Sequence, residues 1–306
     1  MRSRLFWNKF YTQRYLFLML APAFILVLIF SYLPLAGWMI AFRDYQVGQS
    51  LWKADWIGLM HFKRFFLESN DYIYLIRNTL VMNIMSLTLC LFSGCCFAIL
   101  INEIRSRFFM RIIQTITFFP FFISWVIIYS IVNSLFGVTT GVVNELLLSW
   151  GFIQEGINLL GDKAYSWTLI VVMDVWKSLG YNSILFIAAI AGIPPELYEA
   201  AEIDGAKRIA KIWYVTVPHL VPTLIVLLIL NSGWIINSNI EQFFLFTNGS
   251  NWEKMEVLDM YIYKFGMKLL DFPYSTAVSI IKTFVSLVIL LSVNQISKRA
   301  TGSSIF

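Results

Sequence analysis

The sequence predicts an all-α protein that crosses a membrane six times. Of its 306 residues, 58% are hydrophobic and only 13% are charged, whereas soluble domains carry about 25% charged residues. The mean hydropathy is +0.71, and the 27 Phe, 14 Tyr and 11 Trp residues are side chains that suit a bilayer interior and its interfaces. This composition argues against a water-soluble core. The net charge of +5 does not indicate a nucleic-acid partner, because its distribution follows a membrane rule described below.

Each predicted span contains about 20 mostly apolar residues, because a helix rises about 1.5 Å per residue and the hydrocarbon core is roughly 30 Å thick. The six spans are Leu16–Phe42, Asn78–Ile101, Ile112–Leu135, Trp167–Gly192, Leu220–Ile240 and Tyr274–Ile296. The first apolar run is longer than the roughly 7–15 residues of a signal-peptide core, so we expect it to remain as a helix. Residues 1–15 mix basic and aromatic side chains and are predicted to form an interfacial segment. Residues 16–306 are predicted to form one transmembrane domain.

The charges of the connecting segments predict the orientation. On the side of the N-terminus basic residues outnumber acidic ones, and on the other side acidic residues outnumber basic ones. Because Lys and Arg are enriched in cytoplasmic loops, both termini are predicted to lie in the cytoplasm, with the protein in the plasma (inner) membrane. The outer loops, 43–77, 136–166 and 241–273, are long. The inner side has a short turn at 102–111 and one longer loop at 193–219.

The inner loop 193–219 carries the most specific pattern of the sequence. Pro194 and Pro195 end the fourth span, and Pro195 suits the first turn of a new short helix. Gly205 permits a left-handed turn after that helix, and a second helical stretch follows. The loop is therefore predicted to form a helix–turn–helix on the cytoplasmic face. Its small and charged side chains are suited to docking into a groove of another protein.

This loop contains a spaced motif. It reads Glu199-Ala200-Ala201, three residues, then Gly205 flanked by Asp204 and Ala206, and it continues as Thr216-x-Pro218-x-x-x-Pro222. The order resembles the EAA loop of the type I, binding-protein-dependent ABC importer permeases. In that family the loop is the coupling helix, which fits a cleft in a cytoplasmic ATPase. The resemblance therefore assigns ATPase coupling to Glu199, Ala200, Ala201, Asp204, Gly205 and Ala206. The sequence departs from the family at Ile212, where Phe is common.

Four further segments resemble the carbohydrate branch of this family. They are Trp56-Ile57-Gly58-Leu59-x-x-Phe62, Asn78-Thr79-Leu80, Phe119-Pro120-Phe121 and Gly141-Val142-Val143-Asn144. The resemblance covers nearly the whole chain. It implies the type I ABC importer permease fold over residues 16–306. It also implies a permease subunit that transports oligosaccharides or polysaccharide fragments and acts in a heterodimer.

The resemblance also implies partners, because the chain lacks the GxxxxGK[ST] loop that binds nucleotide phosphates. ATP and Mg²⁺ are expected to bind to a separate cytoplasmic ATPase dimer. This chain is therefore expected to be a transport subunit and not an enzyme, and to need no cofactor of its own. A second permease subunit, an extracellular solute-binding protein and an oligosaccharide substrate are expected as well. The three cysteines and two histidines have no metal-ligand spacing, so no metal site is predicted.

Three ionisable residues fall within predicted spans: Asp174 and Lys177 in the fourth, and Lys282 in the sixth. A charged side chain at the bilayer centre costs about 2.5–3.5 kcal/mol on insertion scales, so these residues are expected to face the bundle interior. In one interpretation, Asp174 forms an ion pair with Lys177 or Lys282 that locks the bundle. In the other, the cluster lines the outer substrate path, and its net charge of +1 suits sugars that carry carboxylates.

Aromatic and amide side chains near these charges are further candidates for the substrate path. Trp176, Tyr181 and Asn182 follow Asp174 in the fourth span, and Asn231 lies in the fifth. Sugar sites combine aromatic surfaces with amide and hydroxyl partners. The same polar side chains can instead join transmembrane helices to each other by hydrogen bonds, and both interpretations stay open at this point.

Two other transport functions remain as alternatives. A secondary transporter driven by an ion gradient would account for the intramembrane charges, but not for loop 193–219, and no pair of broken, repeat-related helices is visible. An ABC permease for a non-sugar solute would keep the loop and differ only in the substrate path. A membrane enzyme is unsupported, because no span contains a Ser-His-Asp set, metal-ligand spacing or paired carboxylates.

Overall fold

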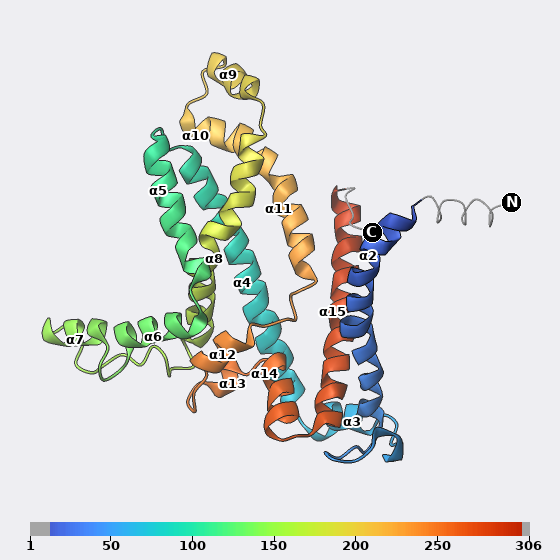
Figure 1. Cartoon of the computed structure of the whole chain (residues 1–306). Coiled ribbons are helices and arrows are strands. Elements are labelled where there is room, and N and C mark those ends of the chain that lie inside the picture. Colours follow the sequence, from blue (N-terminus) through green and yellow to red (C-terminus); the bar gives the residue numbers. More distant parts are fainter. Residues whose placement is uncertain (1–12, 302–306) are drawn as a thin grey trace. The chain divides into compact units, whose positions relative to one another are not determined.

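The computed structural model describes residues 13–301, which are largely helical (Figure 1). In this part of the chain, strand-like pairing is confined to an isolated antiparallel bridge between Arg43 and Trp56. The chain divides into two compact units, Met1–Glu68 with Ile262–Ile280 and Ser69–Tyr261 with Ile281–Phe306. Most of the predicted interfacial segment, residues 1–12, lies outside the described residues.

The first unit begins with a long apolar helical segment that matches the first predicted span. The segment consists of α2 (Arg14–Val27), η1 (Leu28–Tyr32) and η2 (Leu33–Phe42). It is followed by the short helices η3 (Leu51–Lys53), α3 (Met60–Lys63) and η4 (Arg64–Glu68). The unit also contains η7 (Lys264–Lys268) from later in the chain. Phe42 stacks on Trp56 with 5.5 Å between ring centroids and lies 5.3 Å from Phe62. The predicted Trp56–Phe62 motif therefore folds back onto the end of this segment.

The second unit is built around long apolar helices. They are α4 (Asp71–Asn102), α8 (Ser166–Ala191), α11 (Val217–Ser232) and the part of α15 (Phe272–Thr301) that follows residue 280. α4 and α8 cross closely, since a Cβ added at Gly94 would lie 2.8 Å from the Cβ of Asn182. A Cβ at Gly180 of α8 would lie 2.6 Å from the Cα of Phe118. Small residues let transmembrane helices approach each other, and these two glycines allow α8 to lie close to α4 and to α5.

The third predicted span, Ile112–Leu135, is interrupted by a sharp bend and is not one continuous helix. α5 (Arg107–Phe118) and the 3₁₀ turn η5 (Phe119–Phe122) are followed by α6 (Trp125–Phe136) at an angle of 103°. Pro120 cannot donate a backbone hydrogen bond, and Ile123 is extended with φ −76° and ψ 133°. Ser124 then caps α6 by accepting a hydrogen bond from the Ile127 amide.

The fifth predicted span ends earlier than expected. The sequence predicts a helix to Ile240, but α11 ends at Ser232, and α12 (Ile240–Phe246) begins a separate short helix. The residues between them, 233–239, form turns and irregular backbone. By length and composition, the described residues contain five helices that can cross a membrane, or six if the bent pair counts as one span.

Short helices pack against the outer ends of the long ones to form a core. They are α12, α13 (Trp252–Met255) and α14 (Leu258–Tyr263), and their core includes Trp125 and Ile170. α7 (Val142–Ser149) packs against α6. The predicted motif at the start of the second span joins this region. Asn78 donates to the backbone oxygens of Glu253 and Glu256 at 2.9 and 3.1 Å, and Thr79 accepts a hydrogen bond from the Leu258 amide.

Candidate functional site: the inner loop and an internal cavity

The inner loop folds as the predicted helix–turn–helix. α9 (Pro195–Ile203) begins with Pro195 in its first turn, and α10 (Arg208–Lys211) continues through the π-helical turn η6 (Ile212–Thr216) into α11. Gly205 has φ +79°, a conformation that only glycine adopts at little cost. The Ala206 amide donates to the Ala201 carbonyl at 2.8 Å, and the Gly205 amide donates to the Glu202 carbonyl at 3.0 Å. This pair of bonds is a Schellman cap, and it gives Gly205 a definite structural role.

α9 presents most of its surface to the surroundings. None of its residues is buried, and it projects beyond the ends of α4, α5 and α8 (Figure 1). Glu199 and Ala200 are exposed, and Ile203 is 87% exposed. Tyr214, in the following turn, is 83% exposed. Exposed apolar side chains beside acidic ones are typical of a surface that another protein covers.

Polar contacts hold α9 and α10 to the rest of the second unit. Lys211 donates to the Glu202 carboxylate at 2.7 Å, and this lysine holds the pKa of Glu202 below its usual range. Arg208 binds both the carboxylate and the backbone oxygen of Glu103, just after α4. The loop is therefore tied to the turn between α4 and α5.

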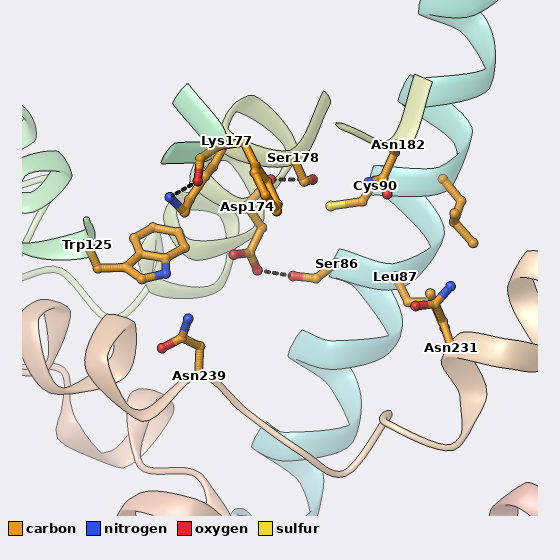
Figure 2. A pocket seen from close by; sticks show the side chains of 12 residues that line it. Ser86, Leu87, Cys90, Trp125, Asp174, Lys177, Ser178, Asn182, Asn231 and Asn239 are labelled. Atoms are coloured by element: carbon orange, nitrogen blue, oxygen red, sulfur yellow. Dashed lines mark hydrogen bonds between the residues drawn. The ribbon is translucent and has the colours of Figure 1, made fainter. Parts of the chain in front are cut away.

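A second candidate site is a cavity of about 320 Å³ inside the second unit. Figure 2 shows that its lining comes from α4 on one side, α8 and the α5–α6 bend on another, and the segment around α11 and α12 on a third. The lining residues are Ser86, Leu87, Cys90, Leu91, Phe121, Trp125, Asp174, Lys177, Ser178, Asn182, Asn231 and Asn239. Four predicted candidates for the substrate path, Asp174, Lys177, Asn182 and Asn231, therefore lie together.

The two charged residues of the lining have partners other than each other. Asp174 accepts a hydrogen bond from the Ser86 hydroxyl at 2.6 Å. The Lys177 ammonium donates to the backbone oxygens of Pro120, Phe121 and Ile123 at the α5–α6 bend. The predicted ion pair between Asp174 and Lys177 is replaced by these bonds, because the bend exposes carbonyls without helical donors next to the ammonium.

Lys282 pairs with a residue that the sequence did not single out. Its ammonium lies 2.5 Å from the carboxylate of Asp259 in α14, and the other oxygen of Asp259 accepts from the Ser238 amide at 2.8 Å. Lys282 is not among the residues that line the cavity. The alternative ion pair with Asp174 is therefore also wrong. The expected cluster of three charges with net charge +1 does not form.

Similarity to known proteins identifies the family. The pattern described as "Binding-protein-dependent transport system inner membrane component" matches residues 86–302. The chain belongs to this family. The match begins at Ser86 of the cavity and includes α9, so both candidate sites lie within the permease region that defines the family.

Individual relatives agree with this assignment. Protein LplB of Bacillus subtilis is 38% identical over 96% of this chain and 92% of its own length. The polygalacturonan/rhamnogalacturonan transport system permease protein YteP of the same organism is 36% identical over 97% of this chain and 92% of its own. The crystal structure of a bacterial ABC transporter that imports the acidic polysaccharide alginate matches 97% of this chain and 99% of its own. The TM-score is 0.88 and the identity 34%. The type I ABC permease fold over the six predicted spans is thereby confirmed.

Two predicted residues of the permease substrate path lie elsewhere. Trp176 is 43% exposed and does not line the cavity. Tyr181 stacks on Phe121, with parallel rings and 4.4 Å between centroids, and it also stays outside the lining. Both lie on α8, where neighbouring positions face different directions, so proximity in sequence to Asp174 was a poor guide.

Eight of the twelve lining residues of the permease cavity were not among the predicted candidates, and Ser86, Trp125 and Asn239 show why. Ser86 faces Asp174 from α4, Trp125 follows the α5–α6 bend, and Asn239 ends the irregular segment before α12 (Figure 2). Ser86 belongs to none of the motifs found in the sequence. The position of Trp125 depends on the α5–α6 bend, which hydrophobic periodicity does not reveal. Asn239 belongs to a run rich in asparagine, and this composition was the available signal. The described residues contain no cluster of His, Cys, Asp or Glu that could hold a metal ion.

Proposed function

We propose that this chain is one permease subunit of an ATP-driven importer for oligosaccharides or polysaccharide fragments. The observation that carries the proposal is the likeness to the alginate importer along almost the full length of both chains. The relatives LplB and YteP cover the same length, and the name of YteP specifies a polysaccharide transport system. Neither a soluble nucleotide-binding domain nor a phosphate-binding loop is present in the sequence, so ATP hydrolysis belongs to another subunit.

The expected partners follow from this assignment. A second structure of the alginate importer contains a periplasmic protein bound to an alginate pentasaccharide, and it matches 98% of this chain with a TM-score of 0.88. By analogy, this chain works with a solute-binding protein outside the membrane. A second permease and a cytoplasmic ATPase dimer that binds ATP and Mg²⁺ complete the importer. No cofactor is needed in this chain itself.

The orientation places α9 in the cytoplasm. α9 and α10 lie at the same end of the second unit as the α4–α5 turn, to which Arg208 is bonded through Glu103. This end carries Arg105, Arg107 and Lys207 as well, and clusters of basic residues mark the cytoplasmic side. With an even number of spans, both termini lie in the cytoplasm.

In this function α9 transmits the state of the ATPase to the spans. Glu199, Ala200, Ala201, Asp204, Gly205 and Ala206 form the docking surface and its cap. The ATPase can shift the permease between conformations only if α9 binds differently to its two states. The short, capped helix is suited to this task, because its cap and the Glu202–Lys211 bond hold it to α10, and Arg208 of α10 binds Glu103.

The proposal is tested by purifying the chain from gently solubilised membranes in wild-type form and as Gly205→Pro. Proline fixes φ near −65° and removes the amide that donates to Glu202, so the Schellman cap cannot form. We expect an ATPase and a second permease to accompany the wild type, and the ATPase to be lost from the variant. Gly249→Ala is the matched control, since Gly249 has no atom within 4 Å of an added Cβ.

Transport measurements complete the test. Membrane vesicles with the complete importer should take up saccharide only when ATP is supplied. Uptake that persists without ATP and stops when an ionophore removes the ion gradient would instead identify a secondary transporter. ATP-dependent uptake of a non-sugar solute alone would keep the permease assignment and reject the sugar.

A further inference from the structure

The polar groups of the cavity leave several hydrogen-bond acceptors open to a ligand. The Ser86 hydroxyl donates to the Asp174 carboxylate at 2.6 Å, and the Ser178 hydroxyl donates to the Asp174 backbone oxygen at 2.7 Å. The Asn231 amide nitrogen donates to the Leu227 carbonyl at 2.8 Å. Both hydroxyl donors are therefore engaged within the protein, and the lone pairs of the hydroxyls remain as acceptors. The Asn231 amide keeps its oxygen and a second N–H, and the indole N–H of Trp125 is a further donor of the lining.

Lys177 adds charge to the lining but few free donors. A lysine ammonium has three N–H groups, and Lys177 directs its bonds to the three backbone oxygens of Pro120, Phe121 and Ile123. A ligand carboxylate that attracted this ammonium would take the donor from the Phe121 and Ile123 carbonyls, and the loss of these bonds is unfavourable. The bend between α5 and α6 therefore competes with any anionic ligand for Lys177.

Asp174 is the group that distinguishes ligands by charge. A carboxylate offers about four lone-pair sites, and Ser86 and Gln242 use two of those of Asp174, so it can still accept hydrogen bonds from a ligand. Among the twelve lining residues, Asp174 and Lys177 are the charged ones, and together they carry no net charge. Figure 2 shows the Asp174 carboxylate between Trp125 and Ser86, directed at the cavity. The amides of Asn182 and Asn239, which can donate or accept, complete the polar lining.

We propose that this cavity binds an uncharged glycosyl unit through its hydroxyl donors and discriminates against a uronate carboxylate at the same position. This inference rests on the proposed function and names the substrate class of the site. A sugar hydroxyl both donates and accepts, so it matches a lining that combines the Asp174 carboxylate with amide groups. A carboxylate only accepts and is repelled by Asp174. The volume, about 320 Å³, is near the lower end of the roughly 300–1,000 Å³ of ligand pockets, so a short segment of a saccharide fills it.

Cys90 provides a reporter of occupancy within the site. It lines the cavity and points toward Asp174 (Figure 2), and the other two cysteines of the sequence are Cys95 and Cys96. In a Cys95→Ser/Cys96→Ser background, N-ethylmaleimide can label this chain only at Cys90, and mass spectrometry of the chain measures the rate. The complete importer in membranes is used, without the solute-binding protein, so that only the specificity of the membrane subunits is measured.

Two matched pairs of disaccharides test the charge preference. They are α-1,4-galactobiose with α-1,4-digalacturonate, and β-1,4-mannobiose with β-1,4-dimannuronate, and the members of each pair differ only at C6. We expect at least one neutral disaccharide to slow Cys90 labelling. Its uronate should need about a tenfold higher concentration for the same protection, a ratio that corresponds to about 1.4 kcal/mol.

Asp174→Asn should reduce this concentration ratio, because the amide oxygen still accepts from Ser86 but the repulsion of the uronate carboxylate is removed. Glu145→Gln, which neutralises an exposed carboxylate of α7, should leave the ratio unchanged.

The outcomes separate this inference from the proposed function. Equal or better protection by the uronates in the wild type overturns the inference, and so does the absence of protection by all four disaccharides. Either result leaves the importer assignment intact if saccharide uptake by the same membranes, with the binding protein added, depends on ATP. Loss of ATP dependence with uptake driven by an ion gradient would instead overturn the proposed function.

Discussion

Lys177 illustrates how a charged side chain is accommodated between apolar helices. The break at Ile123 leaves the carbonyls of Phe121 and Ile123 without the amides that a continuous helix would supply, and the Lys177 ammonium binds both of them as well as the Pro120 carbonyl. Its charge also lies 5.5 Å from the Trp125 ring centroid, a distance at which the ring face attracts a cation. The lysine therefore stabilises the bend and does not form the ion pair expected from its spacing with Asp174.

Lys177→Met should destabilise the permease moderately. The Pro120 oxygen keeps the Ile123 amide as a donor, so two carbonyls lose their partner, at about 1–3 kcal/mol each. Removing an intramembrane charge returns about 2.5–3.5 kcal/mol, so the midpoints of the two ranges leave a net loss of about 1 kcal/mol. Thermal unfolding followed by size-exclusion chromatography in detergent measures it. Lys163→Met is the matched control, because the Lys163–Glu253 pair is about half exposed and such pairs contribute about 0–1 kcal/mol.

Gly180→Ala tests the closest helix crossing. The added Cβ would lie 2.6 Å from the backbone of Phe118, so α5 and α8 must separate, and overpacking of this kind costs about 1–3 kcal/mol. We expect a lower unfolding temperature and weaker binding in the cavity, since Phe121 and Lys177 lie on the two displaced elements. Gly37→Ala should be neutral or stabilising, because Gly37 is helical and has no atom within 4 Å of its added Cβ. Equal effects of the two substitutions would contradict the close crossing.

At the scale of elements, the irregular segment 233–239 is held by a polar network. Asn83 donates to the Ile235 carbonyl at 2.7 Å and to the Ser238 hydroxyl at 3.1 Å. Asp259 accepts from the Ser238 amide and pairs with Lys282. This network satisfies backbone groups that a helix would otherwise pair, which is the condition for non-helical backbone at membrane depth. The segment connects Asn231 to Asn239, so the network positions two lining residues of the cavity.

The Asp259–Lys282 pair should behave as a buried pair in a double-mutant cycle. Its side chains are only 15% and 13% exposed, so removing one partner leaves an uncompensated charge and costs about 3–5 kcal/mol. Asp259→Leu and Lys282→Met should each reduce stability strongly, whereas the double variant should be less destabilised than the sum by about 0.5–3 kcal/mol. Additive losses in thermal unfolding would show that the two side chains act independently.

The elements differ in how well the sequence predicts them. α9 and its cap were predictable, because Pro195 and Gly205 determine local backbone geometry whatever surrounds them. The bend after Pro120 was not, since proline is common in straight transmembrane helices whose neighbours satisfy the freed groups. The partners of Lys177 and Lys282 were also unpredictable, because they depend on carbonyls of a bend and on Asp259 in a segment assigned to an outer loop. Composition located the lining asparagines, and tertiary contacts selected which of them face the cavity.

For the whole molecule, α8 is the element that both candidate sites share. It carries Asp174, Lys177 and Asn182 in the cavity, and its C-terminal end leads through Pro194 directly into α9. A continuous helix rises about 1.5 Å per residue with every backbone group bonded inside it, so α8 transmits displacements of α9 with little loss. Coupling between ATP hydrolysis and the cavity is therefore expected to depend on the continuity of α8 between Asn182 and Ala191.

Ala188→Pro interrupts this connection without touching either site. Proline removes one helical hydrogen bond and its ring clashes with the Ile184 carbonyl, which kinks a helix, while Ala188 is exposed and outside the cavity lining. We expect the ATPase to copurify with the variant and saccharides to protect Cys90 as in the wild type, but ATP-driven uptake to fall by at least about tenfold. That loss corresponds to about 1.4 kcal/mol. Ala188→Leu keeps the amide and the helix and should transport normally. Normal uptake by Ala188→Pro would show that the coupling motion reaches the cavity through α11 instead. α11 follows the C-terminal end of the inner loop, whereas α8 precedes its N-terminal end.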